Sequence, residues 1–128
     1  MDRNTPYMDG ELVAVPLAAV AVEAGKIAAI NASGFAVEGS TATTLTYFGR
    51  FEESVDNSGG AAGDVTVLVR RKKAFKWKNS GSDAVVQADM GKTCYIVDDE
   101  TVAKTNGTNT RSAAGKVIKI DTDGVWVE

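Results

Sequence analysis

The chain has 128 residues, of which 44% are hydrophobic and 24% charged, and its net charge at pH 7 is −3. This composition predicts one folded domain rather than a disordered chain. The absence of histidine excludes histidine-dependent catalytic triads and removes the commonest transition-metal ligand, and a single cysteine allows no intrachain disulfide, which favours a cytosolic origin.

The first apolar stretch, Val13–Val22, is about half the ~20 residues that a membrane-spanning helix needs, and Pro16 interrupts it. Its β-branched residues favour a strand. Asp2 and Arg3 cancel in charge, so no positive start for a signal peptide precedes it. We expect the mature chain to begin at or near residue 1, with residues 1–10 as a flexible arm.

An internal repeat follows. Residues 25–38 (GKIAAINASGFAVE) and 115–128 (GKVIKIDTDGVWVE) align without a gap and share the same residue at several positions. A fainter copy, residues 91–104 (GKTCYIVDDETVAK), keeps the opening Gly-Lys, the later Ile and an acidic turn. Each copy has a short β-branched run, a polar tetrapeptide and a second alternating run, which predicts a β-hairpin.

The tetrapeptides NASG and DTDG place Asn31 or Asp121 at the start of the turn and Gly34 or Gly124 at its end. This order is typical of a type I turn followed by a residue with positive φ. We therefore expect positive φ at both glycines.

Other segments also alternate with a period of two. Thr44–Phe51 and Asp64–Arg70 are rich in residues that suit strands, and the turn-rich segments 57–63, 79–83 and 105–110 separate the runs. One short helical turn is expected near Asp83–Met90, with Asp83 as its cap. The fold class predicted is all-β, a small barrel or sandwich built from repeated β-hairpins, with residues 1–128 forming a single β domain.

Residues 70–78 (RRKKAFKWK) hold six basic residues and two aromatics. If the strand that begins at Val65 continues through them, Phe75 and Trp77 face inward while Lys76 and Lys78 face outward. Three interpretations are open: an edge strand guarded by lysines, a protein interface, and a site for single-stranded nucleic acid. We favour the interface, whose candidate residues are Arg70, Arg71, Lys72, Lys73, Phe75, Lys76, Trp77 and Lys78.

Charge weighs against the nucleic-acid interpretation. Without these six positive charges the rest of the chain carries −9 (−3 minus 6), so the run is a positive island on an acidic body. An OB-like barrel that binds single-stranded nucleic acid through Phe75, Trp77 and the neighbouring basic residues is kept as the alternative function.

The sequence gives little evidence for a catalytic site or a metal site. The acidic trio Asp98–Glu100 and the pair Asp121/Asp123 could offer oxygen ligands, but hairpin turns explain both. Cys94 lacks a histidine base, and the glycine-rich segment 57–63 lacks the spacing of a phosphate-binding loop. We predict a protein that is not an enzyme and that has no cofactor and no metal site.

Three segments together resemble a known family: LTYFGRFEESVDNSGGAAGDVTVLVRRKKAFKWKNS (45–80), MGKTCYIVDDETVAKT (90–105) and RSAAGKVIKIDTDGVWVE (111–128). They are similar to the small head proteins of tailed bacteriophages that are encoded beside the major capsid protein and proposed to decorate or cement the capsid. The resemblance implies a β-rich, trimeric protein bound to the outer head surface through the major capsid protein. It implies no catalytic residue.

From these observations we expect a bacteriophage virion structural protein that oligomerises and binds the head surface non-covalently. Its location would be the virion, and the host cytoplasm during assembly. Neither a membrane nor nucleic acid is expected as a partner.

Overall fold

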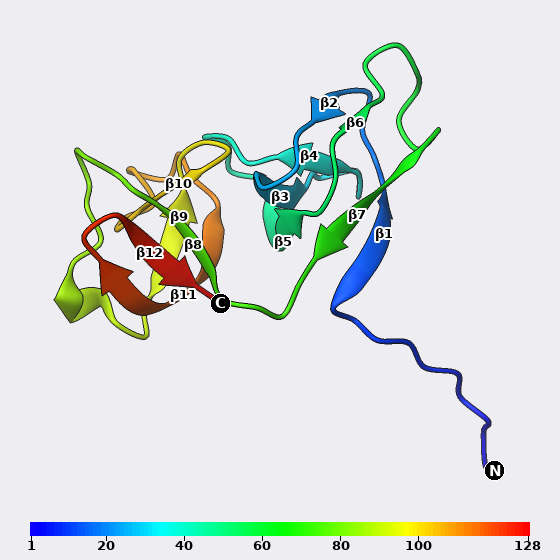
Figure 1. Ribbon diagram of the computed structural model, residues 1–128, viewed down its shortest axis with the longest axis horizontal. Coiled ribbons are helices and arrows are strands. Elements are labelled where there is room, and N and C mark those ends of the chain that lie inside the picture. The colour runs from blue at the N-terminus through cyan, green and yellow to red at the C-terminus, as the bar shows by residue number, and fades with distance from the viewer.

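The computed structural model describes residues 1–128 and is nearly all β, as the sequence predicts. Figure 1 shows two groups of strands side by side, which we call the N-terminal unit and the C-terminal unit. The N-terminal unit contains β1 (Leu12–Pro16), β2 (Ala21–Val22), β3 (Ile27–Ile30), β4 (Ala36–Glu38), β5 (Thr46–Phe51), β6 (Val55–Asp56) and β7 (Thr66–Arg70). The C-terminal unit contains β8 (Phe75–Asn79), η1 (Gln87–Asp89), β9 (Thr93–Ile96), β10 (Thr101–Ala103), β11 (Ala113–Asp121) and β12 (Gly124–Val127).

The two units share one strand order. The main sheet of the N-terminal unit runs β1-β7-β5-β3-β4, and the C-terminal barrel runs β8-β12-β11-β9-β10 before closing on β8. When the five strands of each sheet are numbered in chain order, both sheets have the spatial order first, fifth, fourth, second, third, and neighbours in this order are antiparallel. The third strand meets the first in parallel, as a two-residue pairing of β10 with β8 and as the single bridge Leu17–Ala36. The chain is thus a duplicated five-stranded plan.

A proline explains why only the C-terminal unit closes fully. The register pairs Val15 with Val67 and Trp77 with Val125, so Pro16 occupies the position that Lys78 holds in the second unit. The Lys78 amide donates to the Glu100 carbonyl to close that barrel. Proline has no N–H to donate, so β4 remains an edge of the N-terminal sheet.

All three repeat copies form hairpins, as predicted: β3–β4, β9–β10 and β11–β12. The Asn31 side chain accepts hydrogen bonds from the amides of Ser33 and Phe35, and Gly34 has a φ of +90°. The same expectation is wrong for Gly124, which is not among the glycines with positive φ. There β11 and β12 pair directly at Asp121 and Gly124, so the turn is already complete before the glycine.

The copy with the weaker sequence similarity, residues 91–104, is the structural equivalent of residues 25–38. Gly25 N–H donates to Phe51 O, and Gly91 N–H donates to Val117 O. β3–β4 and β9–β10 therefore occupy the same place in their units, whereas β11–β12 corresponds to β5 and β7.

Two other predictions need correction. Val13–Val22 is not one strand, because β1 ends at Pro16 and β2 begins at Ala21. The expected helical turn is the short 3-10 helix η1, and Asp83 does not cap it. Asp83 instead accepts hydrogen bonds from Thr105 and Arg111, while the Asp89 side chain accepts from the Val86 amide.

Each unit has its own buried cluster, and the clusters meet at the seam between the units. The N-terminal cluster gathers around Phe51, Val67 and Val69. The C-terminal cluster includes Phe75 and Trp77, and it also takes in Ile27 from β3. Since a side chain of one unit lies in the core of the other, the two units share packing; their cooperative folding as one domain stays a prediction.

Candidate protein interface

The run RRKKAFKWK crosses from one unit to the other. Arg70 ends β7, Arg71–Ala74 form the connection, and Phe75 begins β8. The expected continuous strand is therefore wrong. Lys72 has a φ of +59°, a left-handed conformation that breaks the strand and turns the chain towards the second unit.

Phe75 and Trp77 face the core, as expected, and are 8% and 4% exposed. Their ring centroids lie 6.0 Å apart with the planes tilted by 46°. The Trp77 indole N–H donates to the Tyr47 hydroxyl at 3.0 Å, which links β8 to β5 across the seam. Burial raises the pKa of Tyr47 to about 12, so this hydroxyl stays neutral at physiological pH.

The strand that carries these rings is not an edge strand. β8 pairs with β12 on one side and with β10 on the other. The exposed Lys76 and Lys78 therefore do not guard an open edge, and the edge-strand interpretation of the run is wrong.

Four of the six basic side chains form ion pairs within the chain. Each reaches a carboxylate that is distant in sequence: Arg70–Glu52 at 3.0 Å, Lys73–Glu11 at 3.1 Å, Lys76–Asp123 at 2.9 Å and Lys78–Glu100 at 2.7 Å. The Arg70 guanidinium, joined by Arg50, lowers the pKa of Glu52 to about 2. Much of the positive island is therefore compensated by the acidic body around it.

Arg71 and Lys72 complete the run. The Arg71 guanidinium lies 4.3 Å from the centroid of the Phe48 ring and donates to the Gly10 carbonyl at 3.3 Å. Lys72 is exposed, and no ion pair or side-chain hydrogen bond engages its ammonium group. Lys72 is thus the one basic residue of the run whose charge is fully available to a partner.

The acidic residues that could have suggested a metal site have other partners. Glu100 lies between Lys78 and Lys26, and these ammonium groups lower the pKa of its carboxyl. Asp123 pairs with Lys76, and Asp121 accepts a hydrogen bond from the Trp126 indole. No group of three or more metal-ligating side chains is present.

Cys94 lies in the C-terminal core and is 1% exposed. Burial raises the pKa of its thiol to about 11, so at neutral pH it is protonated and enclosed. The structure also contains no helix with the length and hydropathy of a membrane span.

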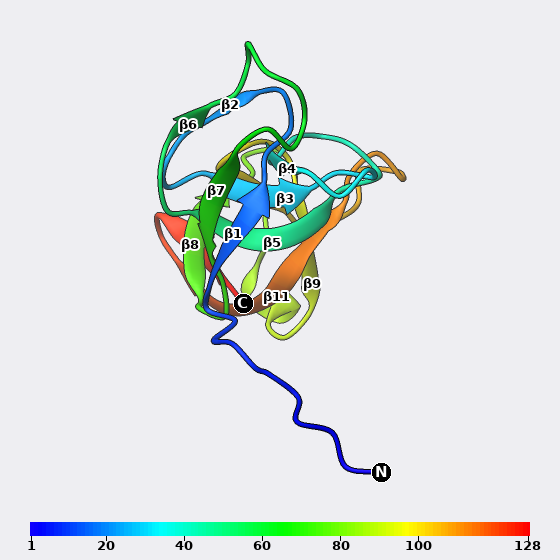
Figure 2. The same ribbon diagram turned by 90° about the vertical axis from the view of Figure 1, so that its right-hand side faces the viewer.

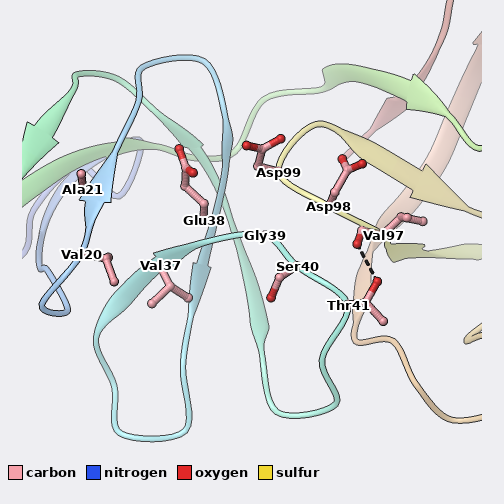
Figure 3. A pocket seen from close by; sticks show the side chains of 10 residues that line it. All are labelled: Val20, Ala21, Val37, Glu38, Gly39, Ser40, Thr41, Val97, Asp98 and Asp99. Carbon is pink, nitrogen blue, oxygen red and sulfur yellow. Dashed lines mark hydrogen bonds between the residues drawn. The ribbon is translucent and has the colours of Figure 1, made fainter. Parts of the chain in front are cut away.

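A pocket that the sequence did not predict lies at the seam, with a volume of about 630 Å³ (Figure 3). Its walls come from the segment around β2, from β4 with the residues after it, and from the β9–β10 turn. The lining residues are Val20, Ala21, Val37, Glu38, Gly39, Ser40, Thr41, Val97, Asp98 and Asp99. No local signal could have found it, because three segments that are distant in sequence form it.

Close packing between the units fixes the pocket wall. Thr41 Oγ1 donates to the Val97 carbonyl at 2.7 Å, a bond drawn in Figure 3. A Cβ at Gly39 would lie 2.8 Å from the Asp98 carbonyl oxygen, so only glycine permits this approach. Partial burial, strengthened by nearby Asp99, raises the pKa of Glu38. The pocket is therefore acidic, with a valine surface beside its carboxylates.

Comparison with known proteins gave no match to a family model, to a curated protein or to a solved structure.

Proposed function

We propose that the protein is a bacteriophage virion structural protein, a capsid decoration or cement protein that oligomerises and binds the head surface non-covalently. The proposal rests on the resemblance of residues 45–80, 90–105 and 111–128 to such proteins. Its partners would be further copies of the chain, as a trimer, and the major capsid protein. It would reside in the virion, and in the host cytoplasm during assembly.

The observation that carries the binding part of the proposal is the number of large apolar side chains at the surface. Nine of them are at least 37% exposed: Met1, Tyr7, Met8, Leu12, Val20, Val65, Val86, Met90 and Ile118. Apolar side chains exposed singly are common on protein surfaces, so the support for docking comes from neighbours such as Tyr7 and Met8. A specific interface of standard size buries about 1,600 Å² in total, and repetition around a symmetric shell adds avidity.

Sedimentation with heads of the phage that encodes the chain tests the proposal. We expect the protein to co-sediment with heads and Lys72→Glu to weaken this binding, because Lys72 offers the uncompensated charge of the run. Lys104→Glu, at another exposed lysine without an ion pair, is the matched control. Absence of the wild-type protein from the head fraction would contradict the proposed function, and equal binding by Lys72→Glu would remove this lysine from it.

The nucleic-acid alternative requires two aromatic rings that can stack on bases, and neither ring is accessible. Phe75 and Trp77 lie in the C-terminal core, and base stacking needs an exposed ring face. Fluorescence titration with oligonucleotides at low salt tests it directly, and salt-sensitive binding would revive it through surface lysines alone.

A further inference from the structure

Residues 1–9, which we call the arm, extend away from the body of the molecule in both views (Figures 1 and 2). Tyr7 is 98% exposed and Met8 is 71% exposed. Within the arm, Arg3 donates to Thr5, and no hydrogen bond or ion pair joins residues 1–9 to any residue beyond Glu11. An aromatic ring and a thioether that contact nothing in their own chain are free to bind elsewhere.

The pocket at the seam is a candidate binding site for the arm. β4 pairs with β3 on one side, and on the other the segment 17–23 flanks it: Ala36 accepts from the Ala18 amide at 3.1 Å, and the Glu38 side chain accepts from the Glu23 amide at 2.9 Å. The pocket lies between this segment, β4 and the β9–β10 turn. An extended segment can bind at such a site through side chains that enter the pocket. A volume of about 630 Å³ is large enough for a few side chains of that segment.

We propose that the arm of one chain docks in this pocket on a second chain, as an extended segment. Tyr7 and Met8 would pack on the valines of the pocket, and Arg3 would face its carboxylates. This inference rests on the oligomerisation part of the proposed function and not on its capsid part.

Charge supports the fit. Arg3 is the only basic side chain of the arm and forms no ion pair in its own chain. In the pocket, Glu38 and Asp98 form no ion pair, whereas Asp99 lies 3.7 Å from Lys26. The raised pKa of Glu38 indicates that this site disfavours an uncompensated carboxylate, which an incoming guanidinium would compensate.

The direction of the arm identifies the occupant as a second copy. The arm leaves the body at the start of β1, whereas the pocket lies beside β2 and β4, beyond the other end of β1. In Figure 2 the arm also points away from these strands. Reaching its own pocket would require the arm to turn back along β1, while nine extended residues span roughly 30 Å towards a neighbour.

Disulfide trapping in purified protein, without heads, tests the inference. We expect Tyr7→Cys chains mixed with Ser40→Cys chains under mild oxidation to form linked heterodimers. Ser58→Cys, on an exposed loop outside the pocket, is the matched control, and the wild-type chain controls for buried Cys94. Equal linking at Ser58→Cys, or linking only within one chain of a Tyr7→Cys/Ser40→Cys double variant, would overturn the inference.

Light scattering gives a second readout. Deleting residues 2–9 is expected to reduce the oligomer to single chains that remain folded, because the arm forms no hydrogen bond or ion pair with residues beyond Glu11. Arg3→Glu should raise the concentration needed for assembly roughly tenfold or more, and Glu38→Lys should restore assembly in that background. An unchanged oligomer after deletion would contradict arm docking and leave head binding to be judged separately.

Discussion

Tyr47→Phe removes the hydroxyl that accepts the Trp77 indole hydrogen bond across the seam. Trp77 is 4% exposed, so water cannot readily replace the lost acceptor at its N–H. A buried donor without a partner costs about 1–3 kcal/mol. At about 4 °C per kcal/mol for a chain of this size, the melting temperature should fall by about 4–12 °C.

Urea and thermal unfolding followed by circular dichroism measure this loss. Tyr95→Phe is the matched control, because it removes a tyrosine hydroxyl that has no side-chain hydrogen bond. In a Tyr47→Phe/Trp77→Phe double variant the donor is absent as well, so the hydroxyl loss should cost less than it does alone. If Tyr47→Phe destabilises the protein no more than Tyr95→Phe does, the hydrogen bond does not hold the units together.

Three further outcomes are expected. Trp77→Ala should lower the free energy of unfolding in urea by about 3–5 kcal/mol, and half-buried Trp126→Ala by clearly less. Arg70 and Arg50 lower the pKa of Glu52 from 4.5 to about 2. The stabilising contribution of Glu52 is therefore complete above about pH 4.5 and is lost as the pH falls towards 2. Acid titration of Glu52→Gln should show a flatter dependence of stability on pH in that window. The Cys94 thiol, with a pKa of about 11, should not react with a thiol reagent at pH 8 until the chain is unfolded.

Local turn chemistry allowed the hairpins to be predicted. In the first copy, the Asn31 side chain binds two nearby amides and Gly34 adopts positive φ, so short-range residues decide the turn. The alternation of Phe75 and Trp77 with lysines likewise predicted which side chains face the core. Each of these signals lies within a few residues of the feature that it predicts.

The features that the sequence did not predict depend on contacts between residues far apart in the chain. Lysine rarely adopts the left-handed conformation seen at Lys72, so nothing local predicted that the strand would break there. The ion pairs that compensate the basic run join residues far apart in sequence, and the pocket needs β4 and the β9–β10 turn side by side. Sequence similarity between residues 25–38 and 115–128 also misled, because equivalent places in the duplicated plan belong to 25–38 and 91–104.

The two units differ in how completely their sheets close. In the C-terminal unit, the Lys78 amide closes the barrel and the basic side chains of β8 are neutralised on its surface. In the N-terminal unit, Pro16 limits the equivalent contact to the single Leu17–Ala36 bridge, and an acidic pocket lies beside β4. In the proposed docking, the carboxylates of Glu38 and Asp98 would favour a segment that carries a positive charge. The two copies of one plan therefore differ in closure: one forms a complete barrel, and the other keeps a single bridge at the same place.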